Sequence, residues 1–488
     1  MEEGRANTTS SSSGGNASSS QQDLGSSTGV TSSNGGQIAA QRTRTVEKDA
    51  SGQGFGLAGH GAPPRRMTMR SDGAARSFHD LFTPEKRLKP APNSWQSFKN
   101  IIFLSPLNIL LLCIPISWAL YFALDLGDNI PGEDCNAHIK NNVGVFVTAF
   151  LAIMPLAQLL SYGTEEIALR VGQTLGGLIN ATLGNAVELI VAIIALFHCE
   201  LTIVQTSLIG SVLSNLLLVL GTCFFVGGLR FKEQEFKQTA AQLNSGLLAM
   251  AVIAVLIPAG FHATLGDNIM DPMERDDLLK VSRGTSIILL VIYGGYLFFT
   301  LSSHKSLYED DDPEEEEQPT LNLTMAIVLL VVSTALVGVT SEWLVDTIDG
   351  VTCTGNISKT WVGLILLPIV SNAAEHVSAV TGAYKAKMDL AMGIAVGSSI
   401  QISIFVIPLL TIISWIASKP LSLLFDPFVA ILLFLAVLVV NYAIADGKSN
   451  YMEGFVLMMV FLVMALVAWF IPDPQDGSQL FPDSACRI

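Results

Sequence analysis

Eleven apolar blocks of about 20 residues follow one another between residues 102 and 471 of this 488-residue chain. Each block is long enough to cross the hydrocarbon core of a bilayer, roughly 30 Å, as a helix. A helix satisfies its backbone hydrogen bonds internally, which lipid requires. We therefore predict an all-α integral membrane protein with about eleven transmembrane helices, at residues 102–124, 142–161, 174–198, 203–228, 241–260, 284–302, 321–345, 358–384, 390–416, 422–444 and 453–471.

The charge composition narrows the expected partners. Only 14% of the residues are charged, and Asp and Glu outnumber Lys and Arg by 42 to 27. An acidic chain without a basic, aromatic-rich patch is a poor nucleic-acid binder, so we expect the lipid bilayer as partner and no nucleic acid. The six cysteines form no CxxC pair, which argues against a zinc site, although Cys135 and Cys353 fall in loops where one bridge is allowed.

The chain is divided by composition into a polar tail and an apolar body. Residues 8–20 are almost all Ser, Thr, Gly, Asn and Ala, and such a segment cannot bury enough apolar surface to fold. Twelve Lys and Arg flank the spans on the side of this tail and seven on the other, which predicts a cytosolic N-terminus. The expected regions are a disordered tail (1–95), an extra helix (102–124), a first repeat (142–302), an acidic cytosolic linker (303–320), a second repeat (321–471) and a C-terminal tail (472–488).

An internal duplication is visible at an offset of 187 residues. The segment GNAVE at 184–188 aligns with SNAAE at 371–375, and Gly-Ser at 210–211 aligns with Gly-Ser at 397–398. We interpret this as one N-terminal helix followed by two five-helix repeats. Because five is odd, the second repeat is expected to be inverted, and inverted repeats place a substrate site near the membrane midplane where they meet.

Two acidic residues occupy matching positions in the repeats. Glu188 and Glu375 each lie about midway along an apolar span. A charge at the bilayer centre costs roughly 2.5–3.5 kcal/mol, so each needs a partner, a proton or a function. A protonated glutamate hydrogen-bonded between helices is the structural alternative. Asn185 and Asn372 precede these acids by three residues, which places amide and carboxylate on one helical face.

Glycines near these acids have two expected roles. Gly184 permits the backbone to open and expose carbonyl oxygens, whereas Ser371 occupies that position in the second copy. Gly393 and Gly397 are spaced as a close-packing face between membrane helices.

Further oxygen atoms are expected from the helices that follow. Ser211, Ser214 and Asn215 share a face in one copy, and Ser398 and Gln401 share one in the other. Hydrogen bonding between helices is the alternative role for these residues. A hard, all-oxygen site suits Ca²⁺ far better than Zn²⁺ or Cu²⁺, and Mn²⁺ is also compatible. The predicted metal site consists of Glu188, Glu375, Asn185, Asn372, Ser211, Ser214, Ser398 and Gln401.

Other ionisable residues have two interpretations each. Of the seven histidines, His376 alone lies deep within a span, either as a satisfied hydrogen bonder or as a group that moves protons beside Glu375. Glu165, Glu166 and Glu342 lie toward span ends, where they suit a cation access path or simple solvation at the interface.

Between the repeats, eight acids fall within nine residues on the expected cytosolic side. The run contains no EF-hand pattern, so it is either a solvated linker or a regulatory segment that responds to Ca²⁺. Its acids are Glu309, Asp310, Asp311, Asp312, Glu314, Glu315, Glu316 and Glu317.

Three motifs make the chain resemble a known family. They are LGGLINAT at 175–182 with GNAVELIVAI at 184–193, PIVSNAAEH at 368–376, and GSSIQI at 397–402. These are similar to the signatures of the Ca²⁺/H⁺ antiporter (cation/proton exchanger) family, vacuolar type, of the Ca²⁺/cation antiporter superfamily. The resemblance covers roughly residues 100–471, and Ser371 departs from the glycine usual in that family.

This resemblance implies secondary transport in place of enzymatic catalysis. It implies exchange of cytosolic Ca²⁺ for lumenal H⁺ by alternating access, with no cofactor, in a vacuolar or similar acidic-organelle membrane. It also implies eleven spans, metal ligation and proton coupling by Glu188 and Glu375, and an adjusting role for His376. The cytosolic acidic linker is a further expectation.

Three rival functions are weighed against this one. A Na⁺-coupled exchanger of the same superfamily could use the same inverted architecture. A Ca²⁺ channel could also present acids, although two acids in inverted copies suit an occluded site better than a symmetric pore. An intramembrane metal hydrolase is disfavoured because neither HExxH nor a histidine pair is present.

Overall fold

The computed structural model describes residues 90–123, 135–171, 173–265, 272–304, 307, 318–353, 357–471 and 486. The chain divides into two units, Met1–Ser71 and Asp72–Ile488, and every described residue belongs to the second. The acidic run at 309–317 and most of the expected tail therefore lie outside the described residues.

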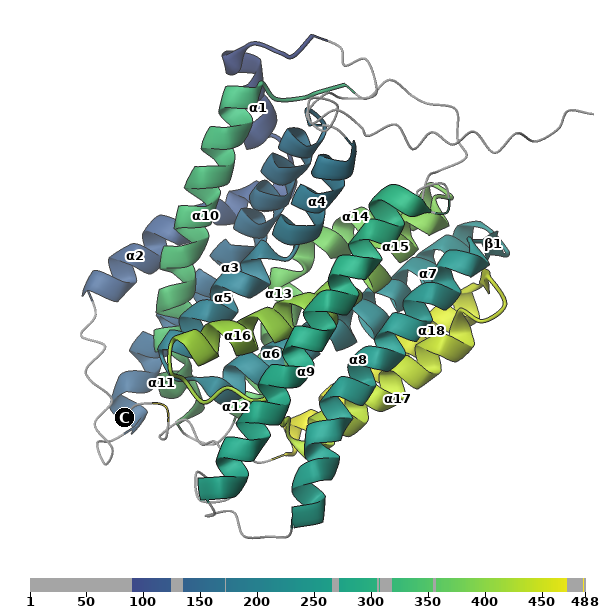
Figure 1. The fold of residues 1–488 in the computed structure, drawn as a ribbon. Helices are drawn as coiled ribbons and strands as arrows, with labels where there is room; N and C mark the ends of the chain where they lie inside the picture. Colours follow the sequence, from purple (N-terminus) through teal and green to yellow (C-terminus); the bar gives the residue numbers. More distant parts are fainter. Residues whose placement is uncertain are drawn as a thin grey trace, which may run out of the picture. The chain divides into compact units, whose positions relative to one another are not determined.

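The extra N-terminal segment lies at the periphery of the helical body (Figure 1). It comprises α1 (Ser94–Ile102), the 3₁₀ helix η2 (Pro106–Leu112) and α2 (Cys113–Ala123). Residues 106–123 are apolar enough to span a membrane, and only 6% of them are buried against the rest of the protein. This segment contacts α3 along one side and leaves its other side for lipid.

The first repeat is built from helices joined by short connections. In chain order its elements are α3 (Cys135–Ala168), α4 (Gln173–Leu183), α5 (Ala186–Phe197), α6 (Leu201–Leu213), the π-helical turn η3 (Ser214–Val219), α7 (Leu220–Arg230), strand β1 (Gln234–Glu235), α8 (Gln238–Leu265), α9 (Pro272–Phe298) and the π-helical turn η4 (Phe299–Ser303).

The second repeat reproduces the order of the long helices, although its strand comes one helix later. Its elements are α10 (Leu323–Asp346), α11 (Ile348–Thr352), α12 (Lys359–Trp361), the π-helical turn η6 (Val362–Leu366), α13 (Leu367–Ser371), α14 (Ala373–Tyr384), α15 (Met388–Gln401), the π-helical turn η7 (Ile402–Val406), α16 (Ile407–Ile416), α17 (Pro427–Ala443), strand β2 (Lys448–Ser449) and α18 (Tyr451–Trp469). Helices α5 and α14 begin and end 187 residues apart, as the sequence offset predicts.

Local sequence signals explain where several helices begin and end. The side chains of Asn322, Asp426 and Asn450 accept hydrogen bonds from the first turns of α10, α17 and α18, which satisfies otherwise unpaired N–H groups. Helices α5 and α14 both end before a residue with φ of +63°, namely Cys199 and Ala386. These two residues are also 187 apart, so the duplication extends to the helix ends.

The centre of the bundle is formed by the paired helices α6–α7 and α15–α16. Of the residues in their most apolar windows, 78% and 67% are buried. The outer helices α9, α10 and α18 instead expose apolar side chains, as lipid-facing helices do. Those side chains include Ile287, Ile288, Val291, Val331, Val332, Leu462, Val463 and Leu466.

The described residues contain eight helices long and apolar enough to cross a membrane, or up to ten if two bent pairs each count as one span. Helix α17, at the expected span 422–444, is apolar but shorter. The all-α membrane fold is confirmed, and the number of eleven spans stays a prediction.

A buried carboxylate joins the end of α3 to the start of α10. Glu166, 3% exposed, accepts hydrogen bonds from Arg170 Nη1 at 2.9 Å, from Thr320 N at 2.9 Å and from Leu321 N at 3.3 Å. Asn100 of α1 also donates to the Thr320 carbonyl at 2.8 Å. Glu166 is thus a structural anchor, and its interpretation as part of a cation access path was wrong.

The two long helices α3 and α10 run antiparallel. Glu166 near the end of α3 meets the start of α10, while Asn142 near the start of α3 packs against Gly350, beyond the end of α10. Because α3 and α10 correspond at the 187-residue offset, this is the arrangement that an inverted duplication requires.

Two further links connect distant parts of the chain. Strands β1 and β2 pair antiparallel, which joins the connection before α8 to the one before α18. Cys199 and Cys486 form a disulfide that joins the end of α5 to the C-terminal region. The sequence predicted neither link, and the side chain of Cys135 lies outside the described residues.

Candidate functional site

Two broken helices define the centre of the molecule. The axis bends by 43° between residues 175–183 and α5, and by 58° between residues 359–371 and α14. A Cβ atom at Gly184 would lie 2.7 Å from the Asn180 carbonyl oxygen, so the first break favours glycine. The second break follows η6 and Pro368, which cannot donate a backbone hydrogen bond. Ser371 therefore does not prevent the helix from breaking.

Each break places a glutamate in the first turn of the helix that follows. Glu188 belongs to the first turn of α5 and Glu375 to that of α14, and both helix N-termini carry the positive end of the helix dipole. Asn185 and Asn372 are the N-cap residues, but neither side chain caps its helix. Their amides are therefore available to other partners, as at the discontinuous helices of transporters.

A chain of side-chain hydrogen bonds crosses from one repeat to the other. Asn185 Nδ2 donates to Gln401 Oε1 at 2.7 Å, and Ser398 Oγ donates to Asn185 Oδ1 at 2.7 Å. Asn215 Nδ2 lies 3.0 Å from Ser398 Oγ and 3.2 Å from Glu375 Oε2. The Glu375 carboxylate is thereby connected to residues of α5, η3 and α15.

Unpaired amide atoms occur beside this network. Both amide atoms of Asn372 and the Oδ1 atom of Asn215 are buried without a hydrogen-bond partner. A buried polar atom without a partner carries the full cost of its desolvation, and such atoms are rare in native proteins. Unpaired carbonyl oxygens beside a carboxylate are the ligands that a hard cation needs.

A large cavity of about 450 Å³ reaches Glu375, Ser398 and Gln401. Its wall also includes Glu165 near the end of α3 and Asp389 at the start of α15. Further lining residues come from the connection before α8 and from just beyond α9. The cavity therefore extends toward the end of the bundle that carries the acidic linker.

One glycine interpretation fails at this cavity. Open space surrounds the Cβ positions of Gly393 and Gly397, so these residues do not form a close-packing face. Gly393 instead lines the large cavity, where the missing side chain leaves room for solvent.

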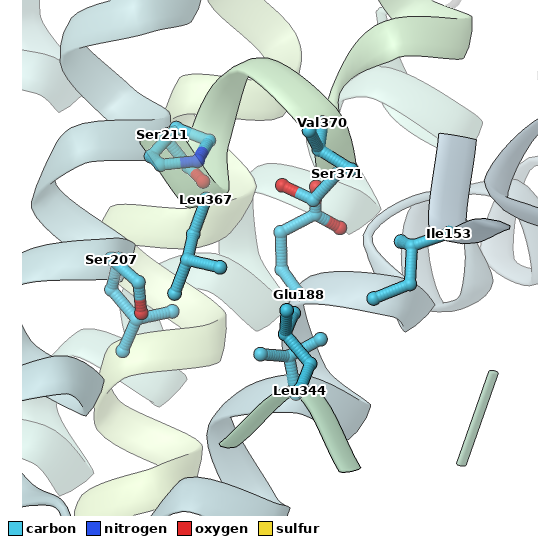
Figure 2. A pocket seen from close by; sticks show the side chains of 11 residues that line it. Ile153, Glu188, Ser207, Ser211, Leu344, Leu367, Val370 and Ser371 are labelled. Carbon is cyan, nitrogen blue, oxygen red and sulfur yellow. The ribbon is translucent and has the colours of Figure 1, made fainter. Parts of the chain in front are cut away.

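Glu188 lines a different and much smaller cavity, of about 20 Å³ (Figure 2). This volume accommodates about one water molecule. Its polar wall consists of Glu188, Ser207, Ser211 and Ser371, and the Ser371 hydroxyl lies beside the Glu188 carboxylate.

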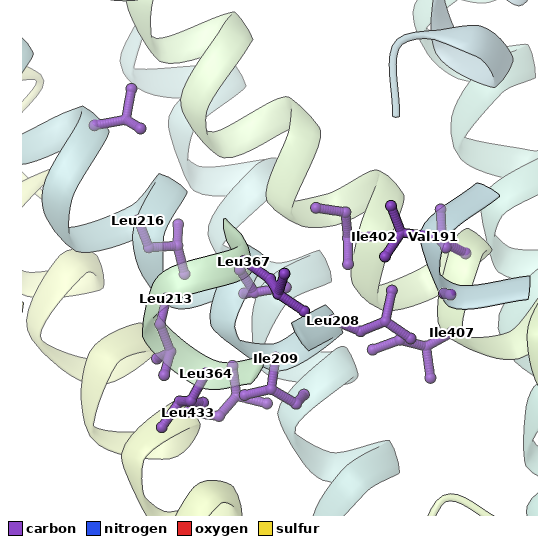
Figure 3. Close-up of a cluster of buried hydrophobic side chains, with 14 of the residues drawn as sticks. Val191, Leu208, Ile209, Leu213, Leu216, Leu364, Leu367, Ile402, Ile407 and Leu433 are labelled. Atoms are coloured by element: carbon purple, nitrogen blue, oxygen red, sulfur yellow. The ribbon is translucent and has the colours of Figure 1, made fainter. Parts of the chain in front are cut away.

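The remaining wall of this small cavity belongs to the apolar core. Val191, Leu208 and Leu367 line the cavity and pack among the buried side chains of α6, η7 and α16 (Figure 3). A cation in this cavity would exchange its hydration water for a few side-chain oxygens. The rest of the wall is apolar, so electrostatic interactions there are strong.

An ion-pair cluster lies at the opposite end of the bundle from the large cavity. Lys359 Nζ lies 2.7 Å from Glu200 Oε2, just before α6, and also pairs with Asp349 of α11. The cluster ties the starts of α6 and α12 together at that end.

Comparisons with known proteins agree with this architecture. The sequence model of the family described as sodium/calcium exchanger protein matches residues 141–302 and 325–470. The chain belongs to the sodium/calcium exchanger family. The two matched segments of this exchanger family coincide with the two repeats.

Individual exchanger relatives extend the match. The vacuolar calcium ion transporter of Cryptococcus neoformans var. grubii is 43% identical, with 82% of this chain and 79% of that protein covered. Vacuolar cation/proton exchanger 2 of Arabidopsis thaliana is 40% identical, with 85% and 91% covered. The solved structure of native YfkE is 34% identical, with a TM-score of 0.62 and 75% and 100% covered. The expected resemblance to the cation/proton exchangers is confirmed.

The exchanger fold gathers the predicted site residues into two groups. Asn185, Ser398, Gln401 and Glu375 join one network, whereas Glu188 and Ser211 share the small cavity. Asn372 is buried at the second break. The Ser214 hydroxyl lies 3.4 Å from His376 Nε2 and so belongs to neither group.

Two residues were missed when the site was predicted. Asn215 was placed on the face of Ser211 and Ser214 but not among the ligands, although its amide is the partner of Glu375. Ser371 was noted only for its backbone. Among the described residues no cluster of three or more His, Cys, Asp or Glu is present, so amide and hydroxyl oxygens must complete any cation site.

Proposed function

We propose that this protein is a secondary transporter that exchanges Ca²⁺ for H⁺, with Glu188 and Glu375 as the groups for which the two ions compete. The observation that carries the proposal is a pair of carboxylates at equivalent helix breaks, one in each repeat, surrounded by oxygen donors inside an apolar bundle. The names of the relatives, a vacuolar calcium ion transporter and a cation/proton exchanger, support the same pair of ions.

Exchange follows from competition for the same atoms. Ca²⁺ requires ionised carboxylates, whereas a carboxyl group in an apolar site is more stable when it carries a proton. A site that holds two carboxylates is close to neutral with either one Ca²⁺ or two protons bound. An empty, doubly charged site is costly in the bilayer, so the transporter changes conformation loaded with one ion or the other.

We infer that access to the site is one-sided in this conformation. The large cavity connects Glu375 with the end of the bundle that carries the acidic linker, and the Lys359 cluster ties the other end. We assign the linker end to the cytosol, so this state would load cytosolic Ca²⁺. Opening toward the lumen would separate α6 from α12 and expose Glu188 through its small cavity.

The cellular setting completes the proposal. A vacuolar or similar acidic-organelle membrane supplies the proton gradient, with the N-terminus and the acidic linker in the cytosol. Mn²⁺ also takes oxygen ligands and is proposed as a second substrate. His376, within reach of Ser214 and next to Glu375, is proposed to adjust proton transfer.

Reconstituted vesicles test the exchange directly. Purified full-length protein, in vesicles with an acidic interior and a clamped membrane potential, should accumulate Ca²⁺ against its gradient until a protonophore collapses the pH difference. An outward Na⁺ gradient at equal pH should drive no uptake. Na⁺-driven uptake would identify a Na⁺-coupled exchanger, and equilibration without accumulation would identify a channel.

A further inference from the structure

The two helix breaks differ in the residue that directly precedes the matching asparagine of each repeat. Gly184 precedes Asn185 in the first repeat, and Ser371 precedes Asn372 in the second. A Cβ atom at Gly184 would lie 2.7 Å from the Asn180 carbonyl oxygen and 3.8 Å from Gln401 Oε1. The first break thus resists a side chain, whereas the second accommodates one.

The side chain at the second break reaches into the other repeat. Ser371 is half-buried and lines the small cavity together with Glu188 of α5. Its hydroxyl lies beside the Glu188 carboxylate (Figure 2). Glycine in place of Ser371 would leave this edge of the cavity without an oxygen atom.

The two carboxylates consequently have different partners. Glu375 accepts a hydrogen bond from the Asn215 amide. The same amide donates to the Ser398 hydroxyl, which links Glu375 to the other amides of the network. The wall of the Glu188 cavity offers three serine side chains, Ser207, Ser211 and Ser371, and no amide side chain. Of these serines, Ser371 lies beside the carboxylate in Figure 2.

We propose that Ser371 is a specificity-determining residue, whose hydroxyl oxygen becomes a cation ligand beside Glu188 and favours Ca²⁺ over Mn²⁺. This rests on the proposed exchange function. Ca²⁺ takes six to eight oxygen ligands in flexible geometry, whereas smaller divalent ions are satisfied by an octahedral set of six. An additional neutral oxygen therefore benefits the larger ion more.

The test compares Ser371→Ala with wild type in the vesicle assay, using Ca²⁺ and Mn²⁺ as separate substrates. Loss of a ligand bonded to a charged group should raise KM for Ca²⁺ roughly 10-fold. KM for Mn²⁺ should change less, so the Ca²⁺ preference falls. Ser371→Thr, which retains the hydroxyl, should restore the wild-type ratio. Ser286→Ala is the matched control, because that buried hydroxyl donates to Ser282 O of its own helix and does not line the small cavity.

The outcomes separate this inference from the function on which it rests. Absence of proton-driven Ca²⁺ uptake by wild type would overturn the proposed function itself. Normal wild-type uptake with unchanged Ca²⁺ and Mn²⁺ KM values in Ser371→Ala would overturn the role of Ser371 alone. If Ser371→Ala fails to reach the membrane, Ser371→Cys takes its place. This variant keeps the side-chain shape but replaces the oxygen by sulfur, and the ratio of its KM values for Ca²⁺ and Mn²⁺ is compared with wild type.

Discussion

The Glu188 and Glu375 half-sites arise from the same duplicated segment, yet they differ in two respects. Glu375 faces a cavity of about 450 Å³ and Glu188 one of about 20 Å³. Glu375 is bonded by the Asn215 amide, whereas the small cavity beside Glu188 is lined by serine hydroxyls and by no amide side chain. The inverted duplication thus preserves the position of the carboxylate in each repeat. The neighbouring helices determine how solvent and ligands reach that carboxylate.

The largest effect should come from neutralising either carboxylate. We expect Glu188→Gln and Glu375→Gln each to abolish proton-driven Ca²⁺ uptake, because each removes a charge that Ca²⁺ needs and a group that carries a proton. Uptake into vesicles, normalised to reconstituted protein, measures this. Normal exchange by one variant would mean that only the other half-site binds the transported ion.

A smaller effect should distinguish the partners of the two acids. Asn215→Ala removes the amide bonded to Glu375, and a hydrogen bond to a charged group is worth about 1.5–3 kcal/mol. We therefore expect KM for Ca²⁺ to rise by roughly 10-fold or more. Thr222→Ala is the control, since that hydroxyl bonds to Leu218 O and contacts Met458 Sδ of α18 but not Glu375. Equal KM values for Ca²⁺ in Asn215→Ala and Thr222→Ala would show that Asn215 does not contribute to Ca²⁺ binding.

Differences in access should be visible by chemical labelling. On a background without reactive thiols, a cysteine at Asn180, which lines the large cavity, should react with a membrane-impermeant reagent added from the linker side. A cysteine at Ser207, in the small cavity, should react far more slowly. Saturating Ca²⁺ should change the two rates in opposite directions if access alternates. Equal labelling of both from one side would contradict the one-sided opening.

The smallest effect is expected at the acidic run, which belongs to neither half-site. Its acids repel one another, and Ca²⁺ screens that repulsion. Neutralising Glu314, Glu315, Glu316 and Glu317 together should shift the cytosolic Ca²⁺ dependence of transport without abolishing it. A curve superimposable on wild type at equal protein level would identify the run as a solvated linker.

Much of the fold could be predicted because membrane spans and an exact repeat offset are local properties of the sequence. Glu188, Glu375 and their asparagines were identified since polar residues stand out in apolar spans. The cavities could not be predicted, because the central helices are apolar on every side and the pattern does not indicate which face is buried. Contacts such as Asn215 with Glu375 join residues 160 positions apart, which only the packed structure brings together.

The anchor at Glu166 has a mechanical consequence. It fastens the end of α3 to the start of α10 through hydrogen bonds from Thr320 N and Leu321 N, and a hydrogen bond to a charged group contributes about 1.5–3 kcal/mol. This corner therefore resists separation of the two helices, and we expect relative rotation of the repeats to hinge here and to be widest at the far end. The acidic linker joins the body at that hinge. A force transmitted through the linker acts close to the hinge. The linker can therefore change the rate of the rotation more readily than the extent of the rotation.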